Sequence, residues 1–113
     1  MKYSIVTSED FERNFIRLSK RYHSLDDDIK ILKKELLTNP RMGDDLGGNF
    51  RKVRMAIASK NKGKKGGARV ITCNVLVSVE DTDIYLLTIY DKGERASISK
   101  SEIKRLKAKN GLA

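Results

Sequence analysis

Five polar residues in the second half of the chain have types and spacing suited to chemistry on a phosphodiester. Lys52 and Arg54 are two residues apart in a segment where apolar and polar residues alternate, so both side chains point to the same face of a strand. Arg69 begins the next strand, which pairs with the first across a hairpin. Tyr90 and Lys92 are again two apart, at the end of the following strand. We therefore expect these five side chains to line one end of a sheet.

The chemistry available to such a cationic cluster is charge stabilisation. Arginines stabilise the negative charge that develops on a phosphorane, and a lysine crowded by other cations has a lowered proton affinity and can act as a general base. The same residues could instead form a binding patch without catalysis, and the residues alone leave both alternatives open. We expect Arg69 to be exposed, because an arginine at this strand start has no evident core partner.

A basic segment, residues 51–69, holds eight positive charges and no acid, which is most of the net charge of +9. Concentrated positive charge favours a polyanion, most often nucleic acid. Four of its lysines, close to the glycines of a turn, are predicted to contact RNA backbone, since glycine permits close approach and lysine neutralises phosphate: Lys60, Lys62, Lys64 and Lys65. A flexible hairpin tip with solvated lysines is the alternative. The segment does not match a nucleotide-binding phosphate loop, because a strand follows it and no serine or threonine comes after the lysines.

Other groupings of reactive residues are weak. Cys73, the only cysteine, lies in an apolar run and is expected to be a buried strand residue. His23 is the only histidine, and Asp26–Asp28 is a charged helix start without spaced partners, so neither a Ser/His/Asp triad nor a metal site is indicated. We predict no metal and no cofactor. The N-terminus has no apolar leader and no apolar run reaches membrane length, so we expect a cytoplasmic protein without membrane contact.

Two helices are predicted to follow a short first strand over residues 2–6. The first begins at a cap residue, Thr7 or Ser8, and its apolar face has helical spacing at Phe11, Phe15, Leu18 and Tyr22. The second begins at Ser24, and Asn39-Pro40 ends it. The short link between them predicts an antiparallel helical hairpin over about residues 8–38.

The second half of the chain changes to strand periodicity. Residues 41–49 are expected to form a loop, and three strands follow, over 50–58, 68–79 and 84–91. A last helix begins at Ser97 or Ser99. Its basic side chains are expected to form a solvated face that raises the positive field near the sheet: Lys100, Lys104, Lys107 and Lys109.

These elements fit a single domain over residues 1–113. A chain of 113 residues with 39% hydrophobic and 35% charged residues can bury one modest core. The order strand, two helices, three strands and helix predicts an α+β fold. We expect the helices to lie against one face of a mainly antiparallel sheet of three or four strands, with an N-terminal helical hairpin packed on that face and a C-terminal helix.

Three segments together resemble a known family. They are NFRKVRMAI, the glycine-lysine turn GKKGGARVI, and the strand IYLLTIYDKGE followed by SKSEIKRL. They resemble the RelE/ParE toxin superfamily, and most of all its HigB-like branch, where a G-K-x-G-G-x-R turn and a Tyr-x-Lys strand end recur. The resemblance spans nearly the whole chain and implies a RelE-like fold.

The resemblance also implies a function. Such proteins are toxins of bacterial type II toxin–antitoxin modules that inhibit translation by ribosome-dependent mRNA cleavage, through metal-independent attack of a ribose 2′-hydroxyl on the adjacent phosphate. The family's basic positions fall on Lys52, Arg54, Arg69 and Lys92. Some members place a catalytic tyrosine near the end of the chain, whereas this sequence has none after Tyr90, so either Tyr90 substitutes or no tyrosine takes part.

The implied partners are the ribosome with its mRNA and a cognate antitoxin with a helix-turn-helix DNA-binding pattern. Operator DNA would be bound only through the complex with that antitoxin. Two alternatives stay open: a gyrase-directed inhibitor of the ParE branch, and a non-catalytic inhibitor or nucleic-acid-binding module that uses the same basic patch.

Overall fold

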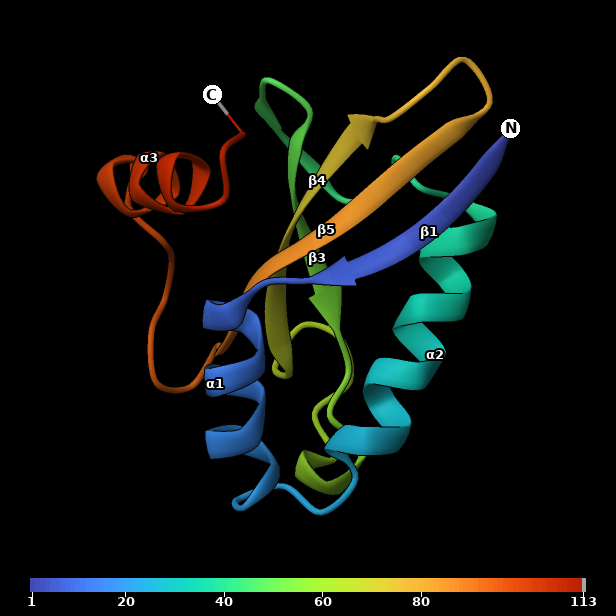
Figure 1. The fold of residues 1–113 in the computed structure, drawn as a ribbon. Helices are drawn as coiled ribbons and strands as arrows, with labels where there is room; N and C mark the ends of the chain where they lie inside the picture. Colours follow the sequence, from blue (N-terminus) through green and yellow to red (C-terminus); the bar gives the residue numbers. More distant parts are fainter. Residues whose placement is uncertain (113) are drawn as a thin grey trace.

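Along the chain, two helices come between the first strand and the other strands of the sheet. In the computed structural model, which describes residues 1–112, the elements follow the order shown in Figure 1: β1 (Lys2–Thr7), α1 (Glu9–Ser19), α2 (Leu25–Thr38), β2 (Asp44–Gly47), β3 (Phe50–Met55), the 3-10 turn η1 (Ala58–Lys60), β4 (Ala68–Leu76), β5 (Asp81–Asp91) and α3 (Lys100–Lys109). The predicted α+β class, with a helical hairpin before the main strands and a helix at the end, is confirmed.

The sheet has five strands in the order β1-β5-β4-β3-β2. Strand β1 runs parallel to β5, and every other neighbouring pair is antiparallel. The additional strand is β2, which lies inside the predicted loop 41–49. Its residues are exposed and have low strand propensity. They form a strand because the free edge of β3 offers hydrogen-bond partners, and because Gly48 and Asn49 take positive φ angles of 58° and 67° in the two-residue turn between the strands.

Serine caps set the start of two helices. The Ser8 side chain accepts a hydrogen bond from the Phe11 N–H at 3.0 Å and donates one to the Leu87 carbonyl at 2.6 Å, so it also fixes α1 to β5. Ser99 accepts a hydrogen bond from the Glu102 N–H at 3.1 Å at the start of α3. These caps select Ser8 over Thr7 and Ser99 over Ser97 among the predicted alternatives.

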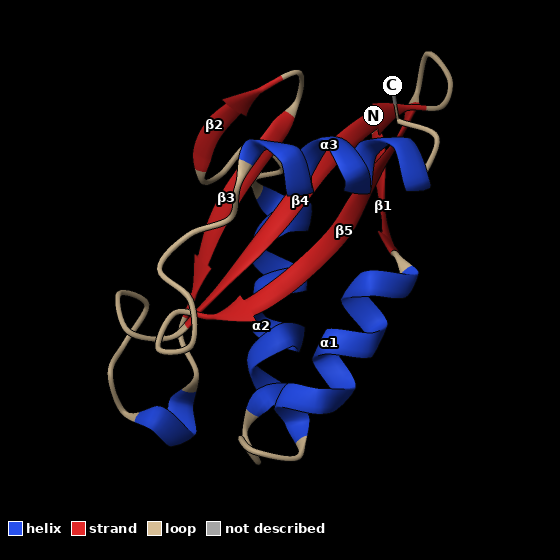
Figure 2. Cartoon of the chain, turned by 90° about the vertical axis from the view of Figure 1, so that its left-hand side faces the viewer, coloured by secondary structure: helices blue, strands red, loops and turns tan. Residues whose placement is uncertain are grey.

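Helices cover both faces of the sheet. The hairpin of α1 and α2 packs on one face through Phe11, Leu18 and Leu32, against strand residues such as Val70 and Ile89. Helix α3 lies across the opposite face, where Leu106 joins a second core of Phe50, Ile71, Cys73, Leu87 and Tyr90 (Figure 2). The expectation that all helices lie on one face is therefore wrong for α3. The reason is visible in β5, whose run IYLLTIY is apolar on both faces and needs cover on both.

Two strands end earlier than predicted. Strand β3 stops at Met55, because η1 begins at Ala58, and β4 stops at Leu76.

Within residues 1–112, none of the helices has the length and the apolar character needed to cross a bilayer.

Candidate nucleic-acid interface

The strand register brings the predicted cations of β3 and β4 together at one end of the sheet. Arg54 is the cross-strand neighbour of Arg69, and Arg69 is the neighbour of Tyr90. Lys52 lies two residues before Arg54 on β3, opposite Ile71 of β4. Alternation places all four on the face that α3 partly covers, because Ile71 and Tyr90 belong to the core beneath α3. The period-two spacing in the sequence predicted this grouping.

Lys52 and Arg54 present their charges to solvent. Arg54 is exposed, Lys52 is half-buried, and together with Lys64 they line a hollow of about 290 Å³ beside Asp44. Neither forms an ion pair with a carboxylate of the part of the chain that the structure describes. Unpaired cations at a concave surface can bind and stabilise phosphate oxygens.

In residues 1–112, no group of three or more His, Cys, Asp or Glu side chains could hold a metal ion.

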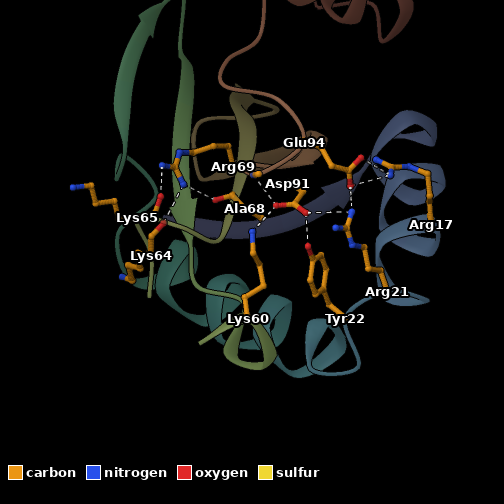
Figure 3. A network of polar contacts seen from close by, with 11 residues as sticks. Arg17, Arg21, Tyr22, Lys60, Lys64, Lys65, Ala68, Arg69, Asp91 and Glu94 are labelled. Carbon is orange, nitrogen blue, oxygen red and sulfur yellow. Dashed lines mark hydrogen bonds and ion pairs between the residues drawn. The ribbon is translucent and has the colours of Figure 1, made fainter. Parts of the chain in front are cut away.

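Arg69 is buried, which corrects the expectation that it is exposed. It is only 5% exposed, and its guanidinium donates to the carbonyls of Lys64 at 3.0 Å, Lys65 at 3.0 Å and Ala68 at 3.1 Å (Figure 3). The loop folds back over Arg69 because Gly67 packs against β3: a Cβ at Gly67 would lie 2.1 Å from the Met55 carbonyl oxygen. The carbonyls of Lys64 and Lys65 point toward Arg69 and need hydrogen-bond donors, which the planar guanidinium of Arg69 supplies.

The Tyr90 side chain is buried, and the Lys92 ammonium is engaged within the protein. Tyr90 is 2% exposed, its hydroxyl has no hydrogen-bond partner among residues 1–112, and the Arg95 guanidinium lies 5.0 Å from its ring centroid. Burial raises the pKa of the Tyr90 phenol. The Lys92 ammonium donates to the Ala96 carbonyl at 2.8 Å. In this conformation the Tyr90 hydroxyl cannot reach a substrate, and the Lys92 ammonium is engaged by the linker before α3.

Asp91 anchors one end of the lysine loop, which is defined here as residues 60–67. This carboxylate is 1% exposed and accepts hydrogen bonds from the Lys60 ammonium at 2.8 Å, the Tyr22 hydroxyl and the Gly93 N–H (Figure 3). Burial alone would raise the pKa of Asp91, but the hydrogen bonds from Lys60, Tyr22 and Gly93 outweigh burial and hold this pKa below its ordinary value. Lys60 was predicted to contact RNA, yet its side chain is 11% exposed and paired within the protein.

The first turn of α2 holds the adjoining turn η1. Asp28 accepts a hydrogen bond from the Ala58 N–H at 3.2 Å, and Ser24 accepts one from the Ser59 N–H at 2.9 Å. Sequence reasoning treated Asp28 only as part of a charged helix start and did not single out Asp91. The available signal was a carboxylate directly after the apolar strand, inside the YDK segment.

Three lysines of the loop remain exposed. Lys62 and Lys65 form no ion pair with a carboxylate among residues 1–112, and Lys64 pairs with Glu35 at 3.2 Å while staying 56% exposed. Because Arg69, Asp91 and η1 hold the backbone, the loop is anchored at both ends rather than free. It therefore presents cations at positions that the fold defines.

The family comparison decides the identity of the chain. The family model for the RelE toxin of the RelE/RelB toxin–antitoxin system matches residues 11–112. The chain belongs to the RelE toxin family. This confirms the resemblance to the RelE/ParE superfamily, and membership of this RelE family implies a cognate antitoxin as a partner. Assignment to the HigB-like branch stays a prediction.

A solved structure shows the same fold. The E. coli toxin RelE, a mutant in the free state, is similar to this RelE-family chain with a TM-score of 0.61 and 19% sequence identity. The similarity covers 93% of this chain and 98% of that chain. At this level of identity the likeness concerns the arrangement of helices and strands, and the roles of individual side chains must be argued from the site itself.

Proposed function

We propose that this RelE-family toxin is a ribosome-dependent mRNA endoribonuclease of the HigB-like branch, one domain acting in the cytoplasm. The observation that carries the proposal is a row of three cations at one end of the sheet, formed by Lys52, Arg54 and Arg69. Arg54 lies opposite Arg69 on the neighbouring strand and two residues from Lys52 on its own strand. Within the described residues 1–112, Arg54 and Lys52 form no ion pair, and both line a solvent-facing hollow, as groups that touch a substrate phosphate must.

The reaction that suits these residues is transfer within the RNA strand. A ribose 2′-oxygen attacks the adjacent phosphorus, the new O–P bond forms as the bond to the 5′-oxygen breaks, and the 2′-proton leaves while the 5′-oxygen gains one. Negative charge builds on the phosphate oxygens in the transition state. Arg54 and Lys52 stabilise that charge, which gives the reaction an electrostatic contribution without a metal ion.

Arg69 acts in this proposal as a positioning residue. Its guanidinium holds the lysine loop through backbone carbonyls, and the loop in turn presents Lys62, Lys64 and Lys65 to RNA backbone. Tyr90 and Lys92 are not among the residues that we expect to touch the substrate in this conformation. The Tyr90 side chain is buried, and the Lys92 ammonium donates to the Ala96 carbonyl.

The test is cleavage of an mRNA on programmed ribosomes by single variants. Lys52→Ala and Arg54→Ala should each slow cleavage by about 10²–10³, as expected when one charge-stabilising donor is removed. Lys34→Ala, which removes an exposed charge from α2, serves as the control and should cleave like the wild type. Equal cleavage by all variants would contradict the proposal. Growth inhibition with an intact message, or inhibition of gyrase, would support the non-catalytic or ParE-like alternative.

A further inference from the structure

The basic residues of α3 fall into two groups, one that pairs with a buried carboxylate and one that forms no ion pair within residues 1–112. Lys109 and Arg105 face the buried Asp10 carboxylate at 3.4 Å and 3.7 Å, and this contact ties α3 to α1. Lys100, Lys104 and Lys107 form no ion pair with any carboxylate within residues 1–112. The expectation of one uniform solvated face therefore does not describe this helix.

The unpaired lysines border a groove. Positions 100, 104 and 107 follow helical spacing and lie on one side of α3, where they line a hollow of about 220 Å³ against the turn between β2 and β3. Its apolar lining is Leu46, Phe50 and Ile103. Leu46 is 38% exposed, and the Lys107 ammonium lies 5.1 Å from the Phe50 ring centroid. Gly47 and Gly48 carry no side chains, which leaves this side of the groove open.

We propose that this groove, lined by Leu46, Phe50 and Ile103 with Lys100, Lys104 and Lys107 at its rim, binds an acidic segment of the cognate antitoxin that inserts an apolar side chain between Leu46 and Ile103. Charge complementarity selects the acids, because a basic rim that has no carboxylate partner among residues 1–112 attracts carboxylates and repels cations. The apolar lining favours a peptide over an RNA backbone, since phosphates and riboses would leave Leu46 and Ile103 without an apolar contact.

The position of the groove explains how occupancy would inhibit the toxin. Phe50, Lys52 and Arg54 alternate on the same face of β3, so the groove lies about 7 Å from the position of Lys52 along the strand. An acidic segment that leaves the groove along β3 reaches Lys52 and Arg54 and covers their charges. The docking itself rests on the toxin–antitoxin pairing, and only this masking step rests on the proposed function.

The experiment measures the affinity of the purified toxin for its antitoxin, the protein whose co-expression restores growth. Lys100→Glu/Lys104→Glu reverses two rim charges and should weaken binding by roughly 10-fold or more, with a flatter salt dependence. Lys30→Glu/Lys34→Glu has the same spacing and charge change on the exposed side of α2 and should weaken binding less than about 3-fold.

A second variant tests the apolar lining separately. Leu46→Ser removes an exposed apolar side chain from an edge strand and should weaken binding about 5-fold without changing the salt slope. Circular dichroism confirms that each variant is folded. Antitoxin binding at wild-type strength by either groove variant would overturn the proposal, and so would a loss of ribosome binding with antitoxin binding intact, which would make the groove an RNA surface. A wild-type toxin that binds antitoxin through the groove but cleaves no mRNA would contradict only the proposed function.

Discussion

Two parts of the basic segment 51–69 carry the same charge but have opposite environments. At the base of the lysine loop, Arg69 is buried, Lys60 is partly buried, and both are engaged by protein acceptors. At its tip, Lys62 and Lys65 are exposed, and Arg54 on the adjoining strand is exposed as well. The base of the loop holds the backbone, and the tip and strand offer charge to a ligand. A count of positive residues therefore overstates the charge that is available for RNA.

The largest expected effect comes from breaking the base at Asp91. Asp91→Ala removes the buried carboxylate of this ion pair, leaves the partly buried Lys60 ammonium without its partner, and should lower the free energy of unfolding by about 3–5 kcal/mol. Urea unfolding followed by circular dichroism measures the change. The control is Glu94→Ala, which removes ion pairs to two exposed arginines and should cost less than about 1 kcal/mol. Similar losses in the two variants would show that Asp91 is not a special anchor.

The same carboxylate predicts an acid dependence of stability. The pKa of Asp91 in the folded protein lies below its ordinary value of 3.8, so its stabilisation is fully present above that value and is lost as the pH falls through the folded pKa. Below pH 3.8 the free energy of unfolding should therefore decline more steeply for the wild type than for Asp91→Asn. Parallel profiles of the two proteins in urea titrations at several pH values would refute this role.

Arg69 gives the next largest effect. Arg69→Ala removes the donors to the carbonyls of Lys64 and Lys65 and should cost about 1–3 kcal/mol of stability. Cleavage at sub-saturating toxin should fall as well, because the loosened loop binds RNA less tightly. Hydrogen exchange should then quicken at the Lys92 amide, which donates to Gly67. Arg69→Lys keeps the charge but loses the guanidinium fork, and it should resemble Arg69→Ala. Full cleavage by Arg69→Lys would mean that charge, rather than geometry, is what matters here.

The smallest expected effect lies at the tip. Lys62→Ala/Lys65→Ala should lower the salt slope of log K for ribosome binding by up to about 0.9 per lysine, because each lost phosphate contact releases fewer counterions. Cleavage at saturating toxin should stay within about 3-fold of the wild type, since the proposal gives these lysines a part in RNA binding and none in stabilising the reacting phosphate. An unchanged slope would place both side chains in solvent in the complex.

Local patterns in the sequence predicted most of the fold. Alternation around Lys52 and Arg54 indicated their shared face, and serine with following acids indicated the starts of α1 and α3. These features depend on neighbours within a few residues. Strand β2 could not be predicted in this way, since its exposed residues form a strand only because β3 offers an edge.

The burial of the site residues depends on distant contacts. Lys60 is held within the protein because its ammonium pairs with Asp91, 31 positions later, and no local pattern records that pairing. Arg69 is buried because Gly67 lets the loop close over it, which requires the finished β3–β4 pairing. Tyr90 is covered because α3 crosses the sheet face that holds it. Residue type and spacing thus predicted where these groups lie along the sheet, and tertiary contacts determine which of them are free.

The most direct test of the proposed activity uses a ribosome-bound mRNA with one 2′-deoxynucleotide at the mapped cleavage position. The wild-type toxin should cleave the all-ribose message on ribosomes, and the single deoxy substitution should abolish cleavage at that position, because the attacking 2′-oxygen is absent. Cleavage of the deoxy message at the same position and rate, or inhibition of translation with both messages intact, would contradict the proposal that the exposed cations of β3 serve 2′-hydroxyl attack on mRNA.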